Sequence, residues 1–124
     1  MIFRLKTSQK TMEIFSELSA KSGLKPFALA KLSIAMSLKS NHQSPPFDTD
    51  TNGLELNKQT ITGQYDAIYK CLIEQHYGYH LRDDEYFPKH VKAHIDRGAQ
   101  LLHNEFRYSN DFITQLAGLE GKSI

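Results

Sequence analysis

The chain has 124 residues, of which 40% are hydrophobic and 23% are charged, a composition typical of a single globular domain. Its only cysteine, Cys71, excludes an internal disulfide, and its apolar stretches are too short for a transmembrane helix or a secretory signal. We therefore expect a cytoplasmic protein with no membrane partner.

The charges are unevenly distributed, although the net charge is only +1. Residues 1–40 carry seven basic and two acidic side chains, whereas residues 41–124 carry eight basic and twelve acidic ones. This asymmetry favours a polyanionic partner such as nucleic acid for the N-terminal part. The same lysines could instead solvate two amphipathic helices, and composition leaves both interpretations open.

The first element is a short strand at residues 2–6, because apolar and basic side chains alternate there. Phe3 and Leu5 would lie on one face, and Ile2, Arg4 and Lys6 on the other. A strand of this length needs a partner strand. The pattern alone does not say whether the strand pairs with its mate in a second copy of the chain or merely starts the fold.

A helix is predicted from a cap at Ser8 to about Ser22, since apolar residues recur there at helical spacing. Gly23 occupies the position where a helix stops in a left-handed residue, and Leu24 supplies the apolar contact of such a stop. Pro26 then fits the first turn of a second helix.

That second helix, "PFALAKLSIAMSLK", is apolar on nearly every side, so it must be covered all round. A chain of this size has little material to cover it, which favours packing against other copies. The alternative is a central core helix wrapped by the later helices. The predicted oligomer-interface residues are Phe27, Leu29, Leu32, Ile34 and Met36.

Residues 40–63 form a connection, in which Pro45-Pro46 forbids a helix and Asn52-Gly53 indicates a turn or short hairpin. A third amphipathic helix follows from about Tyr65 and stops near Gly78.

A fourth helix starts at "RDDEYFPKH" with Pro88 in its first turn, and Gly98 would let another helix approach closely. Val91, Ile95 and Leu102 would line its buried face. Ser109 or Asn110 is expected to cap a last helix that holds Phe112, Ile113 and Leu116.

Three chemical interpretations compete with simple packing. Asp48, Asp50, Asn52 and Gly53 match the start of a calcium loop, but Gln59 stands where its bidentate Glu should be. His76/His80 and His90/His94 have the spacing of paired zinc ligands on a helix, but no third ligand is evident. Cys71 precedes His76 by about one turn, yet nothing nearby would activate its thiol. We expect no metal, no cofactor and no catalytic residue, and the role of the four histidines stays open.

The order strand, helix, helix at the start resembles a ribbon-helix-helix module, in which strands of two chains pair and enter the major groove. Pairing Ile2, Arg4 and Lys6 with their symmetry mates would form a small basic ribbon, through which a regulator could read an operator. The remaining residues exceed what a minimal repressor or antitoxin of that kind needs.

Taken whole, the chain resembles the DndE family, the small subunit of the bacterial DNA phosphorothioation (DNA sulfur modification) system. The resemblance rests on "FRLKTSQKTMEIFSELSAKSGLKPFALAKLSIAMSL", on "GLELNKQTITG" and on "HIDRGAQLL". It implies a non-catalytic subunit that binds duplex DNA, preferring nicked duplex, and forms a homotetramer. Sulfur chemistry would belong to partner subunits, a cysteine desulfurase and an ATP-using iron–sulfur protein among them.

We therefore predict a mainly α fold of about five helices with a short N-terminal strand, assembled as an oligomer. The chain would be one domain over 1–124, with a basic segment 1–40, a linker 41–63 and a helical part 64–118. Its function would be DNA binding with little sequence specificity, and the alternative is a ribbon-helix-helix regulator that reads a specific operator. The predicted DNA-binding residues are Arg4, Lys6, Lys10, Lys21, Lys25 and Lys31.

Overall fold

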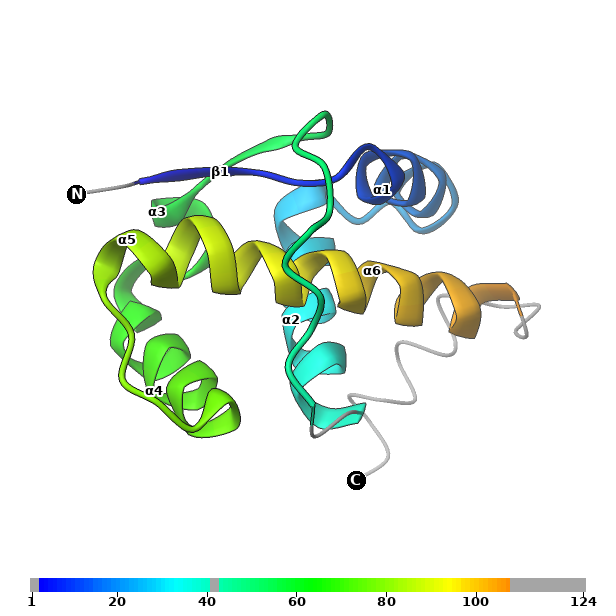
Figure 1. Cartoon of the computed structure of the whole chain (residues 1–124). Helices are drawn as coiled ribbons and strands as arrows, with labels where there is room; N and C mark the ends of the chain where they lie inside the picture. Colours follow the sequence, from blue (N-terminus) through cyan, green and yellow to red (C-terminus); the bar gives the residue numbers. More distant parts are fainter. Residues whose placement is uncertain (1–2, 41–42, 108–124) are drawn as a thin grey trace, which may run out of the picture.

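Helices make up most of the structure, a computed structural model that describes residues 3–40 and 43–107 (Figure 1). The elements in chain order are β1 (Arg4–Lys6), α1 (Gln9–Ser22), α2 (Pro26–Ser40), β2 (Glu55–Asn57), α3 (Lys58–Ile61), a 3₁₀ turn (Gly63–Tyr65), α4 (Asp66–Tyr77), α5 (Asp83–Glu85), a π-helical stretch (Tyr86–Val91) and α6 (Lys92–Arg107). The prediction of a mainly helical fold with a short N-terminal strand is confirmed. The last predicted helix lies outside the described residues.

The ends of α1 follow the sequence signals. The Ser8 hydroxyl accepts a hydrogen bond from the Thr11 N–H at 3.1 Å, which caps the first turn. Gly23 has a φ of 80°, and its N–H donates to the Ser19 carbonyl at 2.9 Å. A left-handed residue of this kind is strained for any side chain with a Cβ, so glycine suits the stop.

The N-terminal strand pairs within the chain. β1 and β2 form a two-stranded antiparallel sheet, in which Leu5 lies opposite Leu56. Both leucines are buried, whereas Phe3 is 54% exposed. The turn at Asn52-Gly53 therefore does not close a local hairpin. It returns the linker to the N-terminus, with the Gly53 N–H donating to the Thr7 carbonyl at 2.9 Å.

The apolar helix α2 lies at the centre of the chain's own core, and α6 crosses it (Figure 1). Leu29 and Ile34 are 0% and 1% exposed within the single chain. This corrects their assignment to an oligomer interface, because their side chains are already covered by this chain. Leu32 and Met36 are half-buried against the core, and Phe27 is 43% exposed.

The close approach predicted at Gly98 is present. A Cβ at this position would overlap the backbone carbonyl of Ser33, so glycine lets α6 pack directly on the backbone of α2. Val91, Ile95 and Leu102 are buried as expected. Pro88, placed by the sequence in a first helical turn, lies instead in the π-helical stretch before α6, and its missing N–H accounts for the irregular hydrogen bonding there.

The helix α4 covers only part of the core. It ends at Gly78, which has a φ of 94°, and it buries Ile73 completely. Its other side leaves Ile68 and Leu72 exposed, and Tyr65 of the preceding 3₁₀ turn is exposed as well. Within the described ranges, no helix combines the length and the apolar character that crossing a membrane would need.

Candidate nucleic-acid interface

The corner between α1 and α2 is a rigid, hydrogen-bonded turn. The Ser22 hydroxyl donates to the Leu18 carbonyl at 2.7 Å and accepts from the Leu24 N–H at 3.1 Å. Pro26 opens α2 immediately afterwards, with φ fixed by its ring. The chain direction through the corner is therefore held by local bonds.

Two lysines flank this corner, Lys21 in the last turn of α1 and Lys25 just before α2. Both are exposed, and no carboxylate of the described residues lies within ion-pair distance of either. The Lys21 ammonium stands 5.1 Å from the centre of the Phe106 ring, which orients its side chain. The corner therefore presents two available cations on a fixed backbone.

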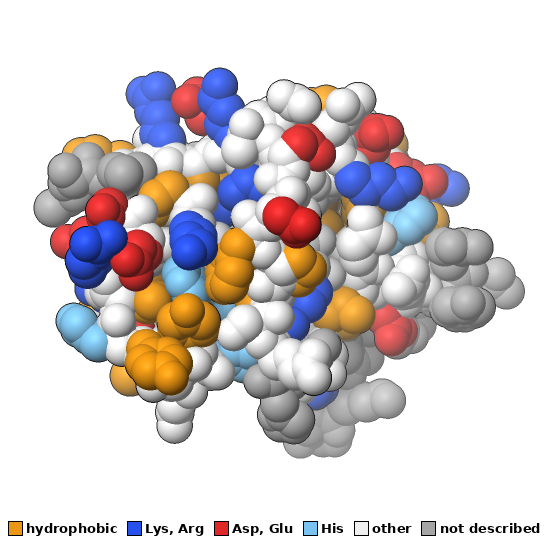
Figure 2. Space-filling model, in the orientation of Figure 1, with side chains coloured by type: hydrophobic (Ala, Val, Ile, Leu, Met, Phe, Trp, Pro, Cys, Tyr) orange, Lys and Arg blue, Asp and Glu red, His pale blue; other side chains and the backbone are white. Residues whose placement is uncertain are grey.

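The other predicted cations lie apart from the corner. Lys6 and Lys10 are exposed near the opposite end of α1, a helix of about 20 Å. Lys31 is exposed on α2, where its ammonium stands 5.5 Å from the Phe27 ring centre. Arg4 is 3.8 Å from Glu55 on the paired strand, so its charge is partly offset. The six side chains are thus spread over β1, α1, the corner and α2 and do not form one patch. Figure 2 shows basic side chains interspersed with acidic ones on the face that includes β1.

Behind the start of α1 lies a buried polar cluster centred on Asp96. Its carboxylate accepts from the Ser8 N–H at 3.1 Å, the Thr11 hydroxyl at 2.7 Å, the Thr49 hydroxyl at 2.6 Å and the Lys92 ammonium at 2.7 Å. Asp96 and Lys92 are both buried. The cluster ties the N-terminus of α1 and the linker to α6. In the sequence, the segment around Asp96 was noted only as part of a family motif. The signal that could have revealed the cluster is an Asp and a Lys four residues apart among apolar neighbours.

Arg97 joins the C-terminal end of α2 to α6 and to the linker. Its guanidinium donates to the Ser37 hydroxyl at 2.7 Å, to the Ser37 carbonyl at 3.0 Å and to the Gln43 carbonyl at 2.6 Å. Carbonyls in the last turn of a helix lack helical partners, so this arginine stabilises the end of α2. Burial lowers the pKa of Arg97 from its ordinary value.

The histidines that have the spacing of zinc-ligand pairs in the sequence are engaged in packing and polar contacts. His76 meets His94, with ring centres 5.2 Å apart, and the Nδ1 of His94 shares a hydrogen bond with the Ser37 hydroxyl at 2.8 Å. His80 is exposed and bonds to Glu74 at 2.8 Å. In the part of the chain that the structure describes, no group of three histidine, cysteine or acidic side chains could hold a metal ion.

His90 packs among aromatic rings. Its ring centre lies 4.6 Å from that of Tyr77 and 4.8 Å from that of Phe47. Burial is the main reason that its pKa is lowered. This environment agrees with the packing interpretation of the histidines.

The linker residues that resembled a calcium loop cap α1. Asp50 accepts from the Gln9 N–H at 2.8 Å and from the Asn52 N–H at 2.9 Å, both at the same oxygen. Both bonds lower the pKa of Asp50, and the bond from the Asn52 N–H has the larger effect. The Asx and Gly residues therefore form a turn that closes on the first turn of α1. Cys71, the other residue considered for chemistry, is exposed on α4.

Together, the fold and this surface define a small, mainly helical protein with a basic helix–helix corner. The family model described as "DNA sulphur modification protein DndE" matches residues 4–110. The chain therefore belongs to the DndE family, as the resemblance predicted.

Two solved structures share this fold. A crystal structure of DndE from Escherichia coli B7A, involved in DNA phosphorothioation modification, is 23% identical with a TM-score of 0.67, and the match covers 82% of this chain and 97% of that one. A DndE G21/24K mutant involved in DNA phosphorothioation is also 23% identical, with a TM-score of 0.64, and the match covers 84% of this chain and 99% of that one. Among curated proteins, no sequence match was found.

Proposed function

We propose that this chain is a non-catalytic, DNA-binding subunit of the DNA phosphorothioation machinery. It binds duplex DNA through exposed lysines with little sequence specificity, and it prefers nicked to intact duplex. The observation that carries the proposal is the α1–α2 corner, where Lys21 and Lys25 are exposed, lack carboxylate partners among the described residues and sit on a fixed turn. Because the chain belongs to a DNA sulphur modification family, DNA is the polyanion that we propose as its ligand.

The composition of the basic surface suits contacts with the DNA backbone. The chain has eleven lysines and four arginines, and Arg97 is held by Ser37 and Gln43 inside the fold. Lysine is a flexible point charge, whereas reading of base edges relies on rigid, bidentate groups. Contacts of this kind position a protein on DNA without selecting a sequence.

The non-catalytic part of the proposal is supported by where the polar side chains lie. The hydroxyls of Thr11 and Thr49 and the ammonium of Lys92 are all engaged by the buried Asp96. These groups hold the fold together and do not face a substrate. The sulfur chemistry then belongs to other subunits of the machinery, which are this chain's protein partners.

A homo-oligomer, in the form of a tetramer, completes the proposal. Repeating the basic corner in each copy raises the avidity for DNA without any new contact. Of the five interface residues predicted from the sequence, Phe27 is the most available, because it is 43% exposed on α2.

The ribbon-helix-helix alternative loses its main support. In that fold the strands of two chains pair, but β1 pairs here with β2 of the same chain. Arg4 consequently lies beside Glu55 and not beside a second basic strand.

The proposal is tested with the double variant Lys21→Ala/Lys25→Ala. We expect it to weaken binding of nicked and intact duplex of one sequence at least tenfold at low salt. The slope of log affinity against log salt should fall by about 2, roughly one for each phosphate that the variant no longer neutralises. Binding titrations at several salt concentrations measure both quantities.

Lys89→Ala is the matched control, because Lys89 lies on the π-helical stretch, away from the corner. It should leave the affinity and the slope unchanged. Equal binding by the double variant and the unmodified chain would refute the assignment of the corner, and no preference for nicked duplex in the unmodified chain would refute that part of the proposal.

A further inference from the structure

The outer side of α4 carries a row of large apolar side chains that the described part of the chain leaves exposed. Ile68 and Leu72 are 58% and 46% exposed, and Tyr65 of the preceding 3₁₀ turn is 57% exposed. Positions 65, 68 and 72 are three and four residues apart, so the three side chains lie on one face of the helix. Large apolar side chains that gather on one surface are typical of a protein–protein contact.

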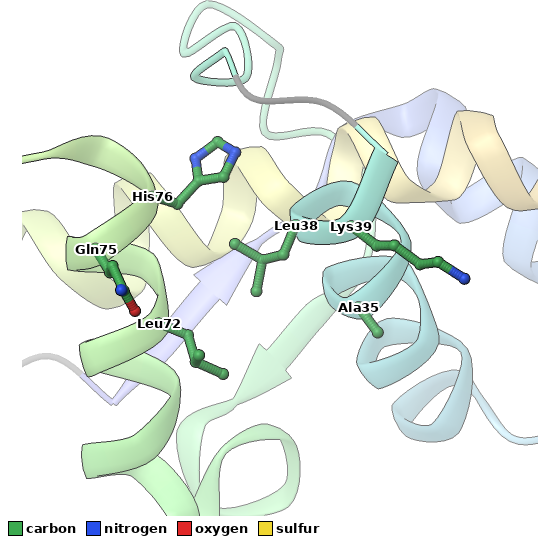
Figure 3. Close-up of a pocket in the computed structure, with 6 residues that line it drawn as sticks. All are labelled: Ala35, Leu38, Lys39, Leu72, Gln75 and His76. Carbon is green, nitrogen blue, oxygen red and sulfur yellow. The ribbon is translucent and has the colours of Figure 1, made fainter.

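A groove continues this row toward the C-terminal half of α2, and side chains of both helices line it (Figure 3). It has a volume of about 440 Å³ and is lined by Leu72, Gln75 and His76 of α4 and by Ala35, Leu38 and Lys39 of α2. The surface thus combines a ridge of side chains with a hollow beside it. A second helix fits such a surface, because helices pack by placing the ridges of one into the grooves of the other.

The exposed side of this segment is free of charge. The exposed residues of the segment 64–75 are Gln64, Tyr65, Ala67, Ile68, Cys71, Leu72 and Gln75. Lys70 and Glu74 of α4 are half-buried, and they pair with Asp83 at 3.2 Å and with His80 at 2.8 Å. Partners match one another in charge across an interface, so this surface suits an uncharged partner surface and not a polyanion.

We propose that the outer side of α4 is a contact between two copies of this chain, in which the two α4 helices pack antiparallel about a two-fold axis near Leu72. A two-fold axis brings the residues beside it against their own copies, so a charge at that place would meet its like. The uncharged face of residues 64–75 avoids this and is complementary to itself. The inference rests on the homo-oligomer proposed above and assigns one of its contacts.

The antiparallel register places each copy against the groove of the other. With the axis at residue 72, residue 68 of one copy lies level with residue 76 of the other, because both are four residues from the axis. Ile68 of each copy therefore packs beside Leu72 and His76 of the other, against the α4 wall of the groove. The groove of one chain is completed by a side chain of the second.

Cys71 reports on this register, because it is the only cysteine, is exposed and lies one residue from the proposed axis. The two copies of Cys71 then lie on the same side of the helix pair. A short bis-maleimide should join them, giving a crosslinked dimer on a denaturing gel.

Cys71→Ser/Gln64→Cys is the matched control, because residue 64 lies on the same side of the helix, two turns earlier. Its two thiols would be about 24 Å apart in the antiparallel pair and should not be joined. Equal crosslinking from both positions would contradict the antiparallel arrangement. Absence of a crosslink at Cys71, in samples that light scattering shows to be oligomeric, would overturn the contact.

A charge swap at the axis tests the contact without thiol chemistry. Leu72→Lys and Leu72→Glu each place like charges against one another, so each variant alone should dissociate with a constant raised at least tenfold. A mixture of the two should recover the mass of the unmodified chain, because opposite charges then meet. Leu72 is 46% exposed, so its substitution leaves the core intact. Light scattering over a range of concentrations measures the masses.

Gln100→Lys, at an exposed position of α6, is the control for an added charge and should leave the mass unchanged. An unchanged mass in both single variants would overturn the α4 contact and leave the proposed tetramer to other surfaces. Two dissociated variants that do not recover on mixing would overturn the two-fold register. A monomeric unmodified chain would overturn the contact and the tetramer together, whereas DNA binding at the α1–α2 corner is judged by the salt titrations of Lys21→Ala/Lys25→Ala.

Discussion

His94 is 1% exposed and lies between α2 and α6, where its Nδ1 shares a hydrogen bond with the Ser37 hydroxyl. Burial, followed by the nearby charges of Arg97, His76 and His90, lowers its pKa to about 3. A histidine in an unfolded chain has a pKa near 6.5, so the unfolded state binds the proton first. The fold therefore depends on a neutral imidazole at this position.

The pH dependence of stability follows from that difference in pKa. Between pH 6.5 and about 3 the unfolded state holds one more proton at His94, so the free energy of unfolding falls as the pH falls. Each pH unit in this window costs up to about 1.4 kcal/mol. Between pH 7 and pH 5, we expect the free energy of unfolding to drop by about 2 kcal/mol from this residue alone.

Urea unfolding at the two pH values measures this drop. His94→Gln should reduce the dependence, while His90, whose pKa burial also lowers, still contributes in that variant. A dependence that is as steep in His94→Gln as in the unmodified chain would assign it to other groups.

The buried ion pair of Asp96 and Lys92 leads to a second prediction about single residues. Their side chains are 5% and 9% exposed, with Oδ2 and Nζ 2.7 Å apart. Asp96→Asn keeps the shape but leaves a buried ammonium without its counter-charge, so we expect a loss of about 3–5 kcal/mol in the free energy of unfolding.

Denaturant unfolding of Asp96→Asn measures this loss. Asp84→Asn, which removes an exposed partner of Arg82, is the control and should change the stability little. A loss under about 1 kcal/mol in Asp96→Asn would mean that Lys92 finds water or another partner.

At the scale of elements, the packing of α6 on α2 depends on Gly98. A Cβ there would overlap the Ser33 carbonyl, and both partners are backbone in the middle of helices. In an open helix, replacing glycine by alanine stabilises by about 1 kcal/mol. Here the clash must instead push the two helices apart.

We therefore expect Gly98→Ala to destabilise the protein by about 1–3 kcal/mol, the reverse of the propensity effect. Thermal unfolding followed by circular dichroism measures the change. Gln100→Ala, an exposed position of the same helix, should be close to neutral. A stabilised Gly98→Ala would show that α6 does not lie against α2 as described.

At the scale of the whole molecule, the net charge of +1 hides the arrangement of the charges. The basic residues of 1–40 that flank α1 are exposed, whereas Lys92 and Arg97 of α6 are held in internal bonds. Under the proposed function, attraction to the polyanion would come from the N-terminal elements. Binding through such charges releases counterions and is therefore sensitive to salt.

If binding is electrostatic, raising the salt from about 50 to about 200 mM should weaken it by an order of magnitude or more. Random duplex should compete nearly as well as any chosen sequence, because specific recognition would instead favour its site by about 10³-fold or more. Competition titrations give this ratio, and light scattering on the same samples tests the proposed tetramer. A large preference for one sequence would favour an operator-reading regulator.

Local signals predicted the elements near the N-terminus well. Ser8, Gly23, Pro26 and Gly78 act as the cap, the stops and the helix start that their chemistry predicts. Such signals operate within a few residues, so the sequence carries them directly. Exposure of Lys21 and Lys25 followed from the same turn. Their function as DNA contacts stays a prediction.

The sequence patterns could not predict which distant segments contact one another. Burial of Leu29 and Ile34 depends on α6, more than fifty residues later, and an apolar pattern does not say which surface covers it. The partner of β1 likewise follows from the path of the linker to β2. The motif around Asp96 did not predict a buried polar cluster, because Ser8 and Thr49 lie far from it in the sequence. They bond to Asp96, together with Lys92, only in the folded chain.

By itself, the sequence determined a mainly helical chain, the positions of most helix ends, the basic character of residues 1–40 and the family. Only the tertiary structure decided that β1 pairs within the chain, that α2 is a core helix and that the histidines pack across helices. The physical reason is the range of the forces involved. Caps and turns are settled by neighbouring residues, whereas burial and buried polar bonds depend on segments that meet only after the chain has folded.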